Sequence, residues 1–115
     1  MKAAFFVTTA PGDEPRIQTM LGYALAAKAM DYDTLVFLAL DGGMLTKKKV
    51  LDNLEPQTRG RFLESLGMGV KIWVCSAAVA TYGIKKEDMI EGVEVKGIAS
   101  FFQFAAESDI SLSWQ

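Results

Sequence analysis

The sequence predicts one α/β domain over residues 1–115, with a doubly wound, mostly parallel five-stranded sheet, flavodoxin-like in outline, and helices on both of its faces. Short apolar runs alternate with segments of helical periodicity along the chain. One run, Leu35–Leu40, is apolar at every position, which is typical of a strand covered on both sides. The 115 residues contain no repeat, low-complexity stretch or linker, so one domain is expected.

The first half of the chain is expected to hold two strands and one long helix. Ala3–Thr8 is a short apolar strand that ends in turn residues. Arg16–Asp31 is a helix, because its apolar residues recur at helical spacing. The next strand covers Asp33–Leu40 and ends at Asp41-Gly42-Gly43, which we interpret as a simple turn. The pattern over Met44–Leu54 predicts no particular structure.

The second half is expected to alternate three helices with three strands. The helices are predicted at Thr58–Leu66, Ser76–Tyr82 and Gly97–Ser108. The strands are predicted at Val70–Val74, Val93–Val95 and Ile110–Trp114. The last helix is apolar on nearly every side, so we expect it to form both core and subunit contact.

The composition excludes several classes of protein. The absence of histidine removes Ser-His and Cys-His catalysis and histidine metal sites, and we expect neither a metal nor a cofactor. One cysteine cannot form an internal disulfide, which favours a reducing, cytoplasmic location. A net charge of −2 does not indicate the basic surface that nucleic-acid binding requires. No apolar stretch is long enough for a membrane span. Half of the residues are hydrophobic, which favours burial in a homo-oligomer.

Cys75 is the first candidate for chemistry, because it lies where a strand passes into a helix. Free backbone N–H groups and the helix dipole at such a place stabilise a thiolate, and Ser76 is the expected N-cap beside it. The competing interpretation is a packed, inert cysteine, since free cysteine is among the most buried residues. The carboxyl ends of parallel strands share one edge, where further contributors are expected. These are Thr8, Thr9, Asp41, Gly42 and Gly43.

Two other sequence patterns are candidates for a functional interpretation. Thr8–Gly12 has the residue types of a phosphate loop, but Asp13 and Glu14 would repel a phosphate, and no complete nucleotide motif is present. Lys47-Lys48-Lys49 is interpreted as a solvated face, with docking of an acidic partner as the alternative.

The second half of the chain combines a strand ending in cysteine, a small-residue helix, a glycine before an acidic turn, and a late helix leading to an acidic residue and a final strand. These features fall on Lys71–Ala78, Tyr82–Ile84, Met89–Val93, Gly97–Phe101 and Ala106–Asp109. In this combination the second half of the chain resembles the DsrE/DsrF/TusD family of sulfur-relay proteins. The N-terminal half resembles the family more loosely.

The resemblance implies a doubly wound α/β fold, assembly into trimers or hexamers, and a persulfide carried on Cys75. Because the chain has no second cysteine, any relay to donor and acceptor proteins must be intermolecular. The first hypothesis is therefore an intracellular sulfur carrier, or sulfurtransferase, that needs no cofactor. The alternative is a non-catalytic oligomeric or small-ligand-binding module in which Cys75 is buried and inert.

Overall fold

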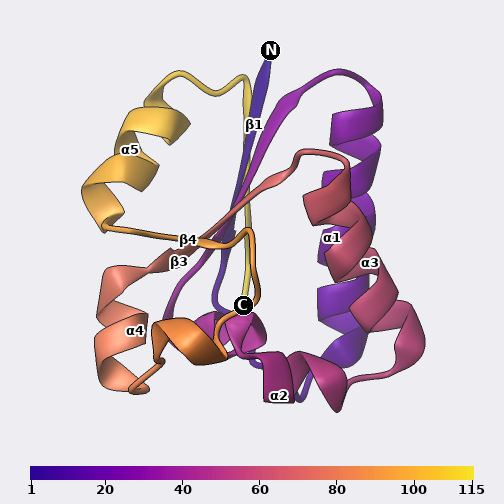
Figure 1. Cartoon of the computed structure of the whole chain (residues 1–115). Coiled ribbons are helices and arrows are strands. Elements are labelled where there is room, and N and C mark those ends of the chain that lie inside the picture. The colour runs from indigo at the N-terminus through magenta and orange to yellow at the C-terminus, as the bar shows by residue number, and fades with distance from the viewer.

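The computed structural model describes residues 1–115 and contains a five-stranded sheet in the order β4-β3-β2-β1-β5, in which every neighbouring pair is parallel (Figure 1). The predicted α/β fold is thus confirmed. The strands are β1 (Lys2–Val7), β2 (Asp33–Leu38), β3 (Lys71–Cys75), β4 (Glu94–Lys96) and β5 (Ile110–Trp114). The α-helices are α1 (Glu14–Ala29), α2 (Lys48–Asp52), α3 (Pro56–Gly67), α4 (Ser76–Thr81) and α5 (Ile98–Ala106).

Helices cover both faces of the sheet, with α1 and α3 on one side and α4 and α5 on the other (Figure 1). The larger apolar core lies under α1 and α3. Its members include Phe5 and Val7 of β1, Ile17, Met20 and Leu21 of α1, and Phe62 of α3. This helical face of α1 has the spacing read from the sequence, and its residues are fully buried.

The smaller core lies under α5 and consists largely of aromatic rings. Phe101 and Phe104 are the buried residues of this helix. The Phe101 ring lies 5.0 Å from the Phe37 ring and 5.2 Å from the Phe6 ring, centroid to centroid. Because β1 and β2 send alternate residues to this side, the strands have apolar residues on both faces, as their continuous apolar runs predicted.

The segment after β2 is not the simple turn expected at Asp41-Gly42-Gly43. Leu40–Thr46 forms a 3₁₀ helix, η1, and α2 follows it within the stretch that the sequence left undetermined. The physical reason is close packing. A Cβ atom at Gly42 would lie 2.5 Å from the Val7 carbonyl oxygen, and one at Gly43 would lie 2.8 Å from the Ala78 Cβ atom. The two glycines therefore let η1 lie directly against β1 and α4.

The strand register places three carboxyl ends side by side. Leu38 at the end of β2 is registered with Val7 on one side and Val74 on the other. The segments that follow β1, β2 and β3 therefore meet at one edge of the sheet, the edge at which such folds place their sites. None of the helices has the length and apolar character needed to cross a membrane.

Candidate functional site

Cys75 is the last residue of β3, and its free thiol is partly buried. Its side chain packs against the aromatic core under α5 and against a second cluster that includes Val74 and Ala78. The thiol thus lies at the junction of β3, α4 and α5, at the carboxyl edge of the sheet, where the sequence placed it.

The expected N-cap at Ser76 is wrong by one residue. Ser76 is already the first residue of α4, and Cys75, with extended backbone angles of φ −63° and ψ 131°, occupies the cap position. No side-chain cap hydrogen bond forms at Cys75. The strand β3 continues through the cysteine, and α4 follows without an intervening turn. Sequence patterns locate such a boundary between strand and helix only to within a residue or two. The helix is six residues long, so its dipole is short.

Beside Cys75 lies a cavity of about 290 Å³ with an almost entirely apolar lining. Segments from five elements contribute to it, from the end of β1 to the start of α5. The lining residues are Phe6, Ala39, Leu40, Cys75, Ala77, Ala78, Thr81, Tyr82 and Ile98. No lining side chain carries a charge, so the cavity favours a polarisable or apolar group over a hydrated anion.

Asp41 reaches this cavity through Tyr82, a residue that the sequence analysis did not select. The Tyr82 hydroxyl donates a hydrogen bond to Asp41 Oδ1. This hydrogen bond, with smaller contributions from desolvation and from the carboxylate charge, raises the pKa of Tyr82 above its ordinary value of 10.0. The single phenolic hydrogen of Tyr82 is therefore engaged by Asp41 and is not free to donate into the cavity.

The hydrogen bond between Tyr82 and Asp41 can be tested by titrating Tyr82. Tyr82 is expected to deprotonate at a higher pH in the wild type than in Asp41→Asn, because the carboxylate holds the phenolic proton. A raised folded-state pKa means that this stabilisation is full below about pH 10 and is lost as pH rises through the folded value. Ultraviolet absorbance of tyrosinate, with Tyr82→Phe subtracted, gives the measurement. Identical curves for the wild type and Asp41→Asn would contradict the contact.

Leu40 forms the exposed rim of the cavity in an unusual backbone conformation. Its φ is +50°, in the left-handed region that non-glycine residues seldom adopt, and its side chain is 67% exposed. Strained residues of this kind persist where the surrounding structure fixes them and are common at binding sites. The side chain, which stands beside the cavity that contains Cys75, adds to the apolar rim.

The loop after β1 does not contribute to this cavity. Thr8 is tied to the C-terminal strand, since its N–H and its hydroxyl both donate to the Trp114 carbonyl, at 2.8 and 3.2 Å. Thr9 is buried, and its hydroxyl has no hydrogen-bond partner. Of the five rim residues expected from the sequence, Asp41 approaches the cavity through Tyr82, and Gly42 and Gly43 allow η1 to pack closely. Thr8 and Thr9 are not among the residues that line the cavity.

Lys96 is a second residue that the sequence analysis missed. It is registered with Cys75 across the β3–β4 pair, and side chains at paired positions share a face of the sheet. Its ammonium lies 5.3 Å from the centre of the Trp73 ring and 3.6 Å from the Glu94 carboxylate. Lys96 lies on the same face of the sheet as Cys75 only because of the register of β4, a strand of three residues. No sequence motif predicts this pairing.

Other polar groups do not form a second centre. No cluster of Cys, Asp or Glu side chains is arranged to hold a metal ion. Lys47, Lys48 and Lys49 line a separate depression together with Asp88, and none of the three forms an ion pair.

The fold and the site together define a small α/β protein with a single cysteine at the carboxyl edge of a parallel sheet. The chain belongs to the DsrE/DsrF-like family, which it matches over residues 1–114. Membership of this family implies a role in sulfur relay. The resemblance seen in the sequence is thereby confirmed.

Among its relatives is an uncharacterized protein of Methanocaldococcus jannaschii, 28% identical over 95% of this chain and 96% of that protein. A segment covering 37% of the chain is 46% identical to the sulfur carrier protein DsrE2 of Allochromatium vinosum and spans 27% of it. The ychN protein of E. coli has the same fold, with a TM-score of 0.80, 22% identity, and coverage of 98% of this chain and 99% of that chain. A protein of unknown function from Methanobacterium thermoautotrophicum aligns with a TM-score of 0.73 and 19% identity over 97% of this chain and 99% of that chain.

Proposed function

We propose that the protein is a sulfur carrier that holds a persulfide on Cys75 and transfers the outer sulfur to a cysteine of a partner protein. The observation that carries this proposal is the position of the only thiol in the chain. Cys75 is partly buried and lines an apolar cavity at the sheet edge in a chain of the DsrE/DsrF-like family.

The transfer needs no oxidant and no cofactor. In loading, the Cys75 thiolate attacks the outer sulfur of a donor persulfide, the donor S–S bond breaks, and the donor leaves as a thiolate. In unloading, the thiolate of the acceptor attacks the outer sulfur on Cys75, and the Cys75 thiolate leaves. Each step exchanges one S–S bond for another, so electrons and protons balance.

The cavity supplies a suitable environment for the carried sulfur. A terminal sulfur atom is large and polarisable, and an apolar lining shields it from water and from reductants. Tyr82 lies in the cavity wall, and Lys96 lies on the strand paired with that of Cys75. The absence of a charged lining predicts that neutral or protein-bound persulfides load Cys75 faster than inorganic dianions do.

The partners of this carrier follow from its single cysteine. Sulfur has to arrive from one protein and leave to another, because no second thiol within the chain can accept it. The carrier is further proposed to act as a homo-oligomer, a trimer or a hexamer, in a reducing cytoplasm that keeps Cys75 free.

Intact mass after incubation with a low-molecular-weight persulfide tests this function. The wild type is expected to gain about 32 Da, one sulfur atom, and to lose it on treatment with a thiol reductant. Cys75→Ser should gain nothing, whereas Ser76→Ala, which keeps the thiol and changes its neighbour, should load like the wild type. A wild-type thiol that takes up no sulfur and is alkylated only in denaturant would refute the carrier function and leave Cys75 as a packing residue.

A further inference from the structure

A surface depression of about 340 Å³ is lined by three lysines and one aspartate. Lys47–Lys49 contribute from the start of α2, and Asp88 contributes from η2, a 3₁₀ helix over Lys86–Asp88. The Lys48 ammonium donates a hydrogen bond of 3.2 Å to the Glu87 carbonyl, which ties α2 to η2. A second depression, of about 360 Å³, shares Lys48 and includes one further lysine. The four lysines of the two depressions are hereafter the basic surface: Lys47, Lys48, Lys49 and Lys86.

The stability of the fold does not account for the basic surface. Lys47 is the N-cap of α2 and Lys48 is its first residue, and a positive charge at that end of a helix is unfavourable. None of the four lysines forms an ion pair, whereas Lys2, Lys71 and Lys96 each pair with a carboxylate. Three of the four are exposed. Proteins break local rules of this kind mainly where function requires it, so this charge is available to a partner.

The basic surface is joined to the cavity that contains Cys75. Lys47 pairs with Met89 in an isolated antiparallel bridge, so α2 and the segment before β4 lie side by side. Ile84 and Met89, which flank η2 in the sequence, are buried in the apolar cluster against which Cys75 packs. Figure 1 shows α2 and this segment, in orange, beyond the same end of the sheet as α4. A partner bound to the basic surface is therefore held at the edge where the thiol lies.

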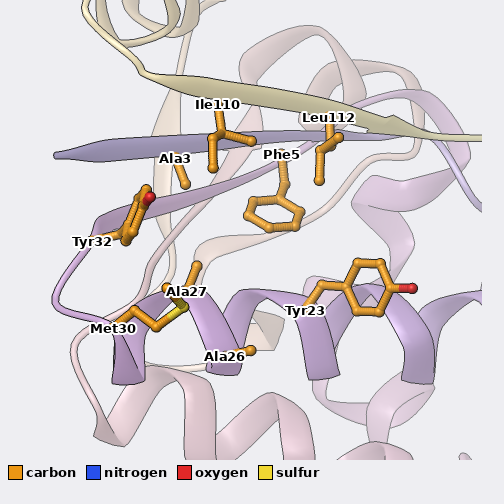
Figure 2. A pocket seen from close by; sticks show the side chains of 9 residues that line it. All are labelled: Ala3, Phe5, Tyr23, Ala26, Ala27, Met30, Tyr32, Ile110 and Leu112. Atoms are coloured by element: carbon orange, nitrogen blue, oxygen red, sulfur yellow. The ribbon is translucent and has the colours of Figure 1, made fainter.

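The apolar groove between β5 and α1 is less suited to a partner that has to reach Cys75. Its volume is about 280 Å³, and Figure 2 shows Ile110 and Leu112 of β5 facing the side chains of α1 across it. Every lining residue is hydrophobic, and Cys75 is not one of them. β1 and β2 separate β5 from β3, the strand that ends in Cys75. The groove thus offers neither charge for recognition nor proximity to the thiol.

We infer that the basic surface docks an acidic segment of the protein that exchanges sulfur with Cys75, and that this docking brings the partner's cysteine to the cavity. The inference rests on the proposed sulfur-carrier function. The uncharged cavity lining can accommodate a sulfur atom but offers little to distinguish one partner protein from another. The basic surface supplies that discrimination, because opposite charges speed the encounter and like charges exclude the wrong partner.

An acidic protein segment fits the basic surface better than a nucleic acid does. Glu87, Asp88 and Glu91 lie along the two depressions and would face some of the phosphates of a continuous backbone. The overall charge of −2 repels a long polyanion more strongly than it repels a short acidic segment. A short segment can place its carboxylates on the lysines alone.

Binding of a glutamate-rich peptide with serine in place of cysteine tests the docking without sulfur chemistry. By fluorescence anisotropy at low salt, the wild type should bind it about tenfold more tightly than a matched glutamine-rich peptide, and high salt should remove the preference. Lys49→Glu should weaken this binding about fivefold. Lys28→Glu makes the same change of charge in the last turn of α1, away from the basic surface, and should bind as the wild type does.

Asp88→Asn is the second variant, and it should tighten binding of the glutamate-rich peptide about twofold or more. It removes the one carboxylate that lines the depression of Lys47–Lys49. A gain in affinity cannot arise from a damaged fold, and circular dichroism checks that every variant is folded.

Sulfur transfer to the corresponding cysteine peptides connects the docking to the function. The loaded wild type should pass sulfur to the glutamate-rich peptide faster than Lys49→Glu does, and comparing the two proteins cancels the effect of the glutamates on the peptide thiol. Both proteins should load equally from a neutral low-molecular-weight persulfide. If the wild type takes up no sulfur, the carrier function fails, and the binding preference alone decides whether the surface docks an acidic segment.

Three results would each overturn the docking inference. The first is equal binding of the glutamate-rich and glutamine-rich peptides by the wild type. The second is equal binding of the glutamate-rich peptide by folded Lys49→Glu and Lys28→Glu. The third is an oligothymidylate of the same charge that binds as tightly as the glutamate-rich peptide, which would make the basic surface a general site for polyanions.

Discussion

Gly42→Ala is expected to lower the free energy of unfolding by about 2 kcal/mol or more, because the added methyl group meets main chain rather than a movable side chain. The Cβ atom would lie 2.5 Å from the Val7 carbonyl oxygen and 3.4 Å from the Thr8 Cα atom. Relief requires η1 to move away from β1. That movement shifts Asp41, which follows Leu40 in η1, away from Tyr82.

Gly60→Ala is the matched control, and this substitution is expected to raise the free energy of unfolding. Gly60 lies within α3 and has no atom within 4 Å of its Cβ position, so alanine should add about 1 kcal/mol through its higher helix propensity. Chemical denaturation of both variants at one protein concentration gives the comparison, because association contributes to apparent stability. A Gly42→Ala protein as stable as the wild type would show that η1 does not need its close approach to β1.

The glycine pair illustrates what a sequence pattern does not contain. Asp41-Gly42-Gly43 reads as a turn because glycine is common in turns, whereas here glycine is required by the approach of η1 to a strand end more than 30 residues earlier. The elements themselves were predictable, since their periodicities are local. β5 was predicted with the bounds that the structure has, and α1 to within two residues at each end.

The candidate site likewise contains one residue that a local sequence pattern predicts and several neighbours that it does not. Cys75 was predictable because a strand end followed by small residues is a local signal. Its neighbours were not. Tyr82 and Asp41 are 41 residues apart and meet only through the packing of α4 against η1, and Lys96 joins the thiol face through strand register. Contacts of this kind depend on tertiary geometry, which the periodicity of the sequence does not predict.

Phe101→Ala should have the largest effect on the α5 side of the molecule, a loss of about 3 kcal/mol or more. Phe101 contacts the rings of Phe6 and Phe37, and only Phe104 joins it as a buried anchor of α5. Removing the ring leaves a cavity between helix and sheet that the rigid strands cannot close. The adjacent Phe102 is 63% exposed, so Phe102→Ala should change the free energy of unfolding by about 0.5 kcal/mol or less.

This pair of variants connects the stability of α5 to the chemistry of Cys75. Ile98, at the first turn of α5, is part of the cavity wall, so a loosened helix opens the cavity before the protein unfolds globally. Alkylation of Cys75 under native conditions should therefore be faster in Phe101→Ala than in the wild type, and unchanged in Phe102→Ala. If both variants react at the wild-type rate while Phe101→Ala is destabilised, then α5 does not control access to the thiol, and the opening lies on the α4 side instead. If the expected order holds, α5 is the element that an acceptor has to accommodate in order to reach the sulfur.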